Sequence, residues 1–178
     1  MADTMTKAQR HYTMSHVHSA STKPELKLRR ALWNNGFRYR VNVKNLPGKP
    51  DIVLSKYRTA IFVHGCFWHG HKGCDKYTTP KTNTDFWKAK ISRNQQHDQD
   101  VWRQLEAKGW SVIVVWECQL KKAVLDETIT RVETEILQNG ELYRQAQENR
   151  KKAREEYREE MRCRKEREAA LEAELQRK

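Results

Sequence analysis

Short apolar runs are spaced along an otherwise polar chain, and each has the length of a β-strand. Residues 51–54 and 59–63 are two such runs with a polar turn between them, which predicts a hairpin. Residues 111–116 are mostly β-branched, which is typical of a strand buried on both faces. Residues 37–43 alternate apolar and polar positions, as a half-buried strand does. The pattern therefore predicts a central mixed sheet of about four strands.

A helix is expected before the first of the paired strands. Thr22 is followed three residues later by Glu25, which is the spacing of a capping box, and Pro24 suits the first helical turn. Asn35 and Gly36 then supply a C-terminal stop signal. Glu25 can therefore have a purely structural role, the closure of this cap.

Two further helices are predicted after the hairpin. One covers 86–108, with a break near Ser92, and the other covers 124–137 and ends at the Asn-Gly pair 139–140. The first of these helices should bury the apolar positions Phe86, Ala89, Ile91, Val101, Leu105 and Ala107. Helices on both faces of a mixed sheet make the expected fold class α/β.

Charge is distributed unevenly along the chain. The formal net charge is +12; residues 1–140 hold 23 basic and 13 acidic residues, whereas residues 141–178 hold 12 and 10. We expect a basic N-terminal arm over 1–20, a folded domain over 21–140 and a charged helical extension over 141–178. The arm either orders on nucleic acid or is a loose terminus, and the extension is either a solvated helix or one that binds a partner. The positive domain favours a polyanionic partner.

The sequence predicts no membrane-spanning helix, because it contains no run of about 18 apolar residues. The N-terminus also lacks the apolar segment of a secretion signal. Both features favour a location in the cytoplasm, where thiols stay reduced. The four cysteines are then better explained as metal ligands than as disulfides.

The densest group of metal-binding side chains follows the second hairpin strand. Cys66, His71 and Cys74 supply three ligands within nine residues, and Cys118, just past the buried strand 111–116, is the natural candidate for a fourth. Four such ligands make a closed tetrahedral zinc site with no open position for water, so the predicted site is structural. The alternative is a set of free thiols beside a surface histidine.

Asp51 stands at the head of a buried strand, where a carboxylate is costly unless it is paired or binds a cation. An acid there, close to the end of the next strand, resembles the magnesium-dependent restriction-type nuclease core, in which a Pro-Asp pair precedes an acid-x-Lys on the next strand. Pro50 and Asp51 are present, but Phe62 replaces the second acid and His64 stands where the lysine would be.

Several separated motifs make the resemblance more specific. Four occur in order: Pro-Gly-Lys-Pro-Asp at 47–51, His-Gly-Cys-Phe-Trp-His at 64–69, Phe-Trp at 86–87 and Val-Val-Trp-Glu-Cys at 114–118. Together they resemble the very-short-patch repair endonucleases (Vsr-type) over roughly residues 8–138, zinc ligands included. Cys74 lies one residue later than in that family, a difference that a loop can absorb. The resemblance implies a restriction-endonuclease-like fold with a structural zinc loop.

An activity is also implied by the resemblance. Members of the family are DNA endonucleases that nick on the 5′ side of the thymine in a T:G mismatch, which arises by deamination of 5-methylcytosine. The implied cofactors are Mg2+ for catalysis and Zn2+ for structure. The implied partner is double-stranded DNA with a T:G mismatch, with mismatch-repair proteins as further candidates, and we expect a monomer.

The family resemblance also implies which residues bind Mg2+. By the resemblance, Asp51 would bind Mg2+ together with the backbone carbonyl of Val63, and Glu25 would orient a water at that site. One carboxylate and one carbonyl form a sparse site, but Mg2+ keeps several waters and binds substrate phosphate oxygens.

The histidines complete the implied catalytic set. His69 would be the general base on the attacking water, His64 would stabilise the phosphate or the leaving group, and Asp98 would support the site or His69. These roles fit the chemistry, because phosphodiester hydrolysis needs an activated water and histidine titrates near neutral pH. For either histidine alone, the alternative is a loop residue or another zinc ligand.

Aromatic and basic side chains are the candidates for DNA recognition. Phe67, Trp68 and Trp87 resemble the aromatic wedge of the family, which enters a base step and unstacks it; the alternative for Trp87 is packing in the core. Phosphate contacts, which add affinity without sequence information, are expected from Lys44, Lys49, Lys72, Lys76 and Lys81.

Two other functions compete with mismatch nicking. The first is a restriction-like or homing-type nuclease that uses the same core on intact duplex. The second is a zinc-stabilised DNA-binding module without catalysis, although the presence of Asp51, His64 and His69 together argues against it.

Overall fold

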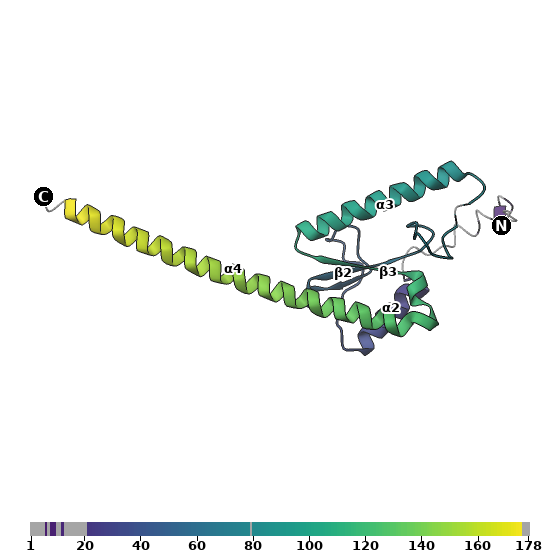
Figure 1. Ribbon diagram of the computed structural model, residues 1–178, viewed down its shortest axis with the longest axis horizontal. Coiled ribbons are helices and arrows are strands. Elements are labelled where there is room, and N and C mark those ends of the chain that lie inside the picture. Colours follow the sequence, from purple (N-terminus) through teal and green to yellow (C-terminus); the bar gives the residue numbers. More distant parts are fainter. Residues whose placement is uncertain (1–5, 7, 10–11, 13–20, 79, 176–178) are drawn as a thin grey trace. The chain divides into compact units, whose positions relative to one another are not determined.

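The computed structural model of the chain describes residues 6, 8–9, 12, 21–78 and 80–175. Its contacts divide the chain into two units, Met1–Asn139 and Gly140–Lys178. The first unit holds the sheet, and Figure 1 shows helices on both of its faces. Most of the predicted arm at 1–20 lies outside the described residues.

Three strands form the sheet. β1 (Ile52–Leu54) pairs antiparallel with β2 (Thr59–His64), and β2 pairs in parallel with β3 (Ser111–Trp116). The strand order is β1-β2-β3. Between β1 and β2 the 3-10 helix η1 (Ser55–Tyr57) makes the turn, and Arg58 closes it in the left-handed conformation with φ 52°. The predicted hairpin and the mixed α/β class are confirmed.

The prediction of a fourth strand over 37–43 is wrong. One isolated bridge joins this segment to the sheet, with Arg40 and Val53 exchanging backbone hydrogen bonds of 2.9 and 2.8 Å. β1 offers only three residues for pairing, and Asn42 has a left-handed backbone with φ 52°, so the ladder stops after one pair. Phe37 is nevertheless buried in the core. The apolar alternation therefore reflects core packing and not strand pairing.

The core has two halves, one on each face of the sheet. On one face, α2 (Lys23–Asn34) and the first part of α4 (Leu125–Leu175) pack on strand residues such as Ile61 and Val115. On the other face, α3 (Thr84–Ala107) packs on a second set. Leu28, Leu32, Ile129, Val132 and Ile136 are the helical residues of the first set, and Val101 and Leu105 are those of the second.

Two predictions about α3 are wrong. The helix is continuous over Thr84–Ala107, without the expected break near Ser92. Phe86 is 62% exposed, so it does not belong to the core, and Ala89 and Ala107 are exposed as well. Ile91, Val101 and Leu105 are buried as expected.

The expected end of the last helix at 139–140 is also wrong, because α4 continues to Leu175. An interior glycine costs a helix about 1 kcal/mol, and a glycine commonly marks a helix end by adopting a left-handed conformation just past it. Gly140 is not among the glycines with positive φ.

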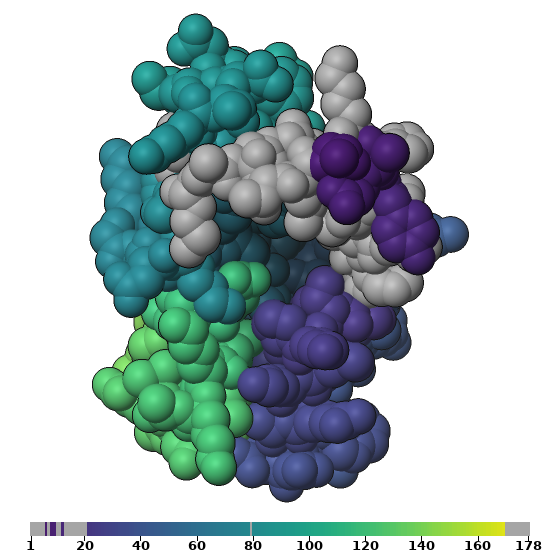
Figure 2. Space-filling view, turned by 90° about the vertical axis from the view of Figure 1, so that its right-hand side faces the viewer, coloured from purple at the N-terminus to yellow at the C-terminus, as the bar shows by residue number. Residues whose placement is uncertain are grey.

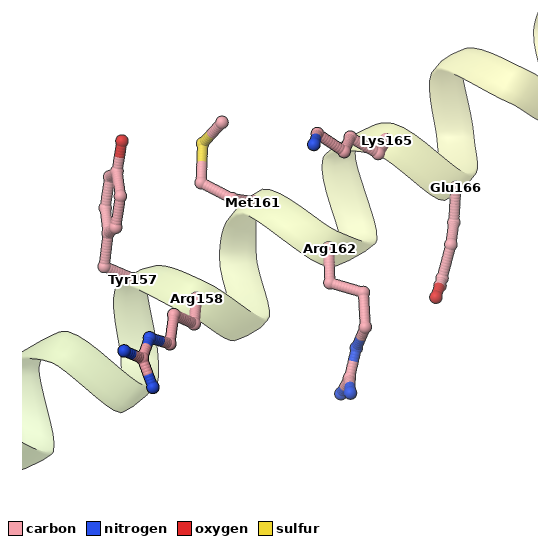
Figure 3. A pocket seen from close by; sticks show the side chains of 6 residues that line it. All are labelled: Tyr157, Arg158, Met161, Arg162, Lys165 and Glu166. Atoms are coloured by element: carbon pink, nitrogen blue, oxygen red, sulfur yellow. The ribbon is translucent and has the colours of Figure 1, made fainter.

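The second unit is the C-terminal part of α4, and its described side chains are nearly all exposed. Figure 3 shows six of them, which project to different sides of this one helix: Tyr157, Arg158, Met161, Arg162, Lys165 and Glu166. Because no other element contributes to this surface, we assign no function to it. Within the part of the chain that the structure describes, no helix is both long and apolar enough to cross a membrane.

Candidate active site and metal centre

The carboxyl ends of the parallel strands β2 and β3 meet at one edge of the sheet, where His64 is paired with Trp116. The loop after β2 and the 3-10 helix η2 (Glu117–Leu120) after β3 therefore start side by side. Figure 2 views this end, where the surface is hollowed between teal residues above and the purple and green residues below. The predicted zinc ligands and His69 lie in these segments, and His64 is the last residue of β2.

The predicted zinc ligands form one cluster. One ligand atom from each of Cys66, His71, Cys74 and Cys118 lies within 4.8 Å of the others, and the Cys118 sulfur is 3.4 Å from His71 Nδ1. Tetrahedral zinc with ordinary bond lengths places a sulfur and a nitrogen ligand about 3.5 Å apart. The four side chains therefore fit a metal ion of this type.

The surroundings of the cluster also favour a cation. Burial raises the pKa of the Cys66 thiol to about 12, so a thiolate there requires a nearby positive charge. The backbone N–H of Lys76 donates to the Cys74 sulfur at 3.4 Å and lowers the pKa of that thiol. The His71 ring stacks on Trp116, with ring centroids 4.1 Å apart and an angle of 2° between the planes. The stack fixes the direction in which His71 presents its nitrogen.

The two remaining histidines meet a carboxylate from α3. His69 Nδ1 lies 2.6 Å from Asp98 Oδ2, and His64 Nδ1 lies 3.9 Å from the same oxygen. The two imidazole rings are stacked, with centroids 3.7 Å apart. His69 and Asp98 therefore form a pair in which the carboxylate sets the ring orientation, and His64 covers the ring face.

His64 is held among aromatic side chains. Phe62, Trp102 and Trp116 surround its ring, with centroid distances of 6.0, 6.0 and 5.5 Å. Burial, and next the proximity of His69, lower the pKa of His64 to about 4. At neutral pH this ring is therefore uncharged.

Asp51 lies at the start of β1, beside the same edge. Its Oδ2 accepts a 2.7 Å hydrogen bond from the backbone N–H of Val63. Burial nevertheless raises the pKa of Asp51 to about 6, and the nearby charges of Glu25, Arg29 and His69 also act on it. A carboxylate kept partly protonated by burial is one that a bound cation would stabilise.

Glu25 has the structural role that its spacing predicted. Its carboxylate accepts hydrogen bonds from the Ser21 and Thr22 backbone N–H groups at 2.9 and 3.3 Å, which closes the cap of α2. It also forms a 3.1 Å ion pair with Arg29. Arg29 in turn donates to the backbone carbonyl of Asp51 at 3.1 Å. Glu25 is therefore linked to Asp51 through Arg29.

The three predicted wedge aromatics are brought together. The Phe67 ring lies 5.2 Å from both Trp68 and Trp87, and the two tryptophans are 5.9 Å apart. Phe86, which is 62% exposed, extends the group through Trp87 at 5.3 Å. These rings form an aromatic surface next to His69 in sequence and at the N-terminal end of α3.

The predicted phosphate-contacting lysines are all exposed and lie in two connections, Lys44 and Lys49 between α2 and β1, and Lys72, Lys76 and Lys81 between β2 and α3. Lys76 forms a 3.2 Å ion pair with Glu117 of η2. The structure thus places these lysines on the surface.

Comparisons with known proteins point the same way as this geometry. A family model described as DNA mismatch endonuclease Vsr matches residues 2–76. The type II nicking enzyme V.NmeAIP of Neisseria meningitidis is 51% identical over 137 residues, which cover 76% of this chain and 97% of that protein. The DNA mismatch endonuclease Vsr of Escherichia coli is 40% identical over 143 residues, which cover 79% and 91%. This chain belongs to the Vsr family.

Membership in the Vsr family makes the chain a DNA endonuclease, as the motifs predicted. The type II nicking enzyme V.XorIIP of Xanthomonas oryzae is a further relative, 46% identical over 120 residues, which cover 67% of this chain and 88% of that protein. DNA is therefore the substrate, and single-strand nicking is the reaction that relatives' names describe.

Sequence reasoning missed two α3 side chains that build the site of this Vsr-family chain. Asn94 Nδ2 donates to the Trp68 carbonyl at 2.8 Å, and Gln95 Nε2 donates to the His69 carbonyl at 3.1 Å. Together with Asp98 they lie at helical spacing on the face that also carries buried Ile91. The sequence signal for them was the occurrence of polar residues on the same helix face as the apolar Ile91.

Arg29 was also missed, although it lies four residues after Glu25, the spacing of an ion pair on a helix. Its buried guanidinium joins α2 to Asp51 through a hydrogen bond to the Asp51 backbone carbonyl.

Proposed function

We propose that this endonuclease nicks the thymine strand of T:G mismatches left by deamination of 5-methylcytosine, on the 5′ side of the thymine, by Mg2+-dependent hydrolysis. The observation that carries the proposal is the convergence of Asp51, His64, His69 and Asp98 at one edge of the sheet. A DNA-binding module without catalysis would gain nothing from such a set.

His69 is the general base in this proposal. A neutral imidazole has one N–H and one free lone pair. In this role the Asp98 carboxylate accepts a hydrogen bond from His69 Nδ1 over 2.6 Å, which places the ring proton on Nδ1 and the lone pair on Nε2. Nε2 is then ready to take a proton from the attacking water. His64, uncharged at neutral pH, would stabilise the phosphate or the leaving group as a hydrogen-bond donor and not as a cation.

Asp51 would hold the magnesium together with the Val63 backbone carbonyl. When bound, Mg2+ would neutralise charge on the reacting phosphate. The raised pKa of buried Asp51 fits this role, since a cation there removes the cost of the ionised carboxylate. Glu25 would act on the same site from α2, where its own capping bonds and Arg29 hold it in place.

The Cys66, His71, Cys74 and Cys118 cluster would hold zinc as a structural ion. It would join the loop after β2 to the end of β3 and so hold His69 and the aromatic surface in position. Four protein ligands complete a tetrahedral shell, so the zinc would stabilise the fold and take no part in hydrolysis.

Mismatch recognition would come from the aromatic surface of Phe67, Trp68 and Trp87. Unstacking a base step costs a few kcal/mol, and a mismatched pair resists it less than a matched one. The exposed lysines at 44, 49, 72, 76 and 81 would contact phosphates, and the arm at 1–20 would add to DNA binding. The proposal also includes a restriction-endonuclease-like core and a charged extension over 141–178 that continues α4. It further includes a monomeric enzyme, with mismatch-repair proteins as partners.

A cleavage assay tests the proposal directly. Three labelled duplexes identical except for T:G, C:G or T:A at one position, in several sequence contexts, are incubated with protein and Mg2+. We expect a nick in the T strand of the T:G duplex alone. Equal nicking of all three would show instead a nuclease of intact duplex.

Variants connect the assay to the site. His69→Ala should abolish nicking and leave DNA binding intact, whereas His97→Ala, which replaces an exposed histidine on α3, should leave both unchanged. Nicking by Asp51→Ala at the normal rate would contradict the magnesium assignment.

A further inference from the structure

A second group of metal-ligand atoms lies apart from the cysteine cluster. One nitrogen from each of His64 and His69 and one Asp98 oxygen lie within 4.8 Å of one another. The ligand types are two imidazoles and one carboxylate, which is the set that divalent transition metals bind in proteins. Mg2+ prefers oxygen ligands, so this set is unlike the Asp51 site.

A buried nitrogen in the group lacks a partner. The His64 side chain is 5% exposed, and its Nδ1 has no hydrogen-bond partner among the residues that the structure describes. A buried polar atom without a partner normally destabilises the folded state. This atom faces Asp98 Oδ2 at 3.9 Å, so an ion between them would satisfy it.

The spacing of the group suits a small ion. Nitrogen and oxygen ligands around tetrahedral zinc lie about 3.3 Å apart, given bonds of about 2.0–2.1 Å. The observed separations from Asp98 Oδ2, 2.6 Å to His69 Nδ1 and 3.9 Å to His64 Nδ1, lie on either side of that value. A shift of less than about 1 Å at each ring would equalise them, and the two stacked rings, with 15° between their planes, must also tilt for both Nδ1 lone pairs to point at one ion. Three protein ligands leave a fourth position for water.

We propose that His64, His69 and Asp98 bind a second transition-metal ion of the zinc type, and that this ion switches nicking off. An ion on His69 Nδ1 occupies the lone pair there, so the single ring proton must sit on Nε2. Nε2 then has no lone pair with which to accept a proton from water. The ion also takes the Asp98 oxygen that holds the ring. The inhibitory half of this proposal rests on the proposed role of His69 as base; the binding half does not.

Binding is tested with Co2+ as a spectroscopic probe of the full-length chain. The protein carries Asp51→Asn, which removes the other proposed divalent site, and one equivalent of Zn2+, which fills the cysteine cluster. Visible absorption during the titration should report one further equivalent of Co2+ without the near-ultraviolet band of a cobalt–thiolate bond. Such a band would mean that Co2+ had entered the cysteine cluster.

Two variants identify the ligands. Asp98→Asn and His69→Gln, each in the same background, should raise the Kd for Co2+ by tenfold or more. His97→Ala, adjacent to Asp98 in sequence but exposed and outside the group, should leave the Kd unchanged. Absence of a second equivalent, or equal affinity in all of these proteins, would overturn the proposal.

Inhibition is tested with Asp51 intact. Zn2+ is titrated into a T:G nicking reaction at fixed Mg2+, and half-inhibition should occur at the Zn2+ concentration that half-fills the second site. Full nicking at saturating Zn2+ would overturn the inhibitory half. Absence of nicking even without added Zn2+ would instead count against the proposed function, while the cobalt result would stand.

Discussion

Replacing Asp51 with asparagine should stabilise the magnesium-free protein at neutral pH while it removes nicking. Burial raises the pKa of Asp51 from 3.8 to about 6, so the folded state prefers the protonated carboxyl. Below about pH 4 the carboxyl is protonated in both states and does not affect stability. As the pH rises from about 4 through 6, the unfolded state releases the proton first, so the free energy of unfolding falls. The asparagine side chain would be neutral at every pH and would keep an oxygen for the Val63 N–H, which donates to the aspartate over 2.7 Å.

The size of the effect follows from the pKa difference of about two, which corresponds to about 3 kcal/mol at most. Residual exposure of the side chain screens the charge and reduces the expected gain to about 1–3 kcal/mol. Urea unfolding of both proteins at pH 4.5 and pH 7.5 measures it, with one equivalent of zinc and no magnesium. The variant should exceed the wild type by the full amount at pH 7.5 and by about a third of that amount at pH 4.5, where the carboxyl is already mostly ionised in the unfolded state alone.

Two controls make this measurement specific. Asp100→Asn removes an exposed carboxylate of α3, whose side chain is 49% exposed, so it should produce no gain that grows with pH. Added Mg2+ should narrow the difference between Asp51→Asn and wild type, because only the wild type retains the magnesium ligand. The reasoning would be refuted by a variant that is no more stable than wild type at pH 7.5.

Three further substitutions test the loop that carries His69. Gly70→Ala would place a Cβ 2.6 Å from Gln95 Nε2 and 2.8 Å from an Ile91 methyl, at a residue with φ 64°; we expect a loss of about 1–3 kcal/mol in thermal unfolding and at least tenfold slower nicking. Asn94→Ala removes the 2.8 Å bond to the Trp68 carbonyl; it should cost about 1 kcal/mol of stability and also lower kcat, with DNA binding measured separately to distinguish the two effects. Cys118→Ser should purify with less than one zinc per chain and melt at a lower temperature, whereas Cys163→Ser, which replaces an exposed cysteine of the extension, should match wild type in both measurements.

Much of the site could be predicted because its signals are local in sequence. The strand at 111–116 and the capping box at Thr22 depend on neighbouring residues, and the structure reproduces both. The three ligands Cys66, His71 and Cys74 lie within one loop, so their spacing alone indicated a shared ion. Such features require only the periodicity of a strand, the geometry of a helix start, or the reach of a short loop.

Tertiary structure alone decided the contacts between distant segments. Residues 37–43 have the alternation of a strand, but β1 is too short to pair with them beyond Arg40. Asn94 and Asp98 reach the Trp68 carbonyl and the His69 ring only because α3 packs on the sheet and against the loop after β2.

The division has a physical reason. Residue types and short spacings determined which candidate groups this protein carries: three metal-ligand side chains in one loop, two further histidines and an acid at the head of a strand. The pKa values of Asp51 and His64, and the 2.6 Å contact between His69 and Asp98, depend on burial and on partners far away in the chain. Burial and long-range contact are properties of the packed fold, so only the tertiary structure could supply them.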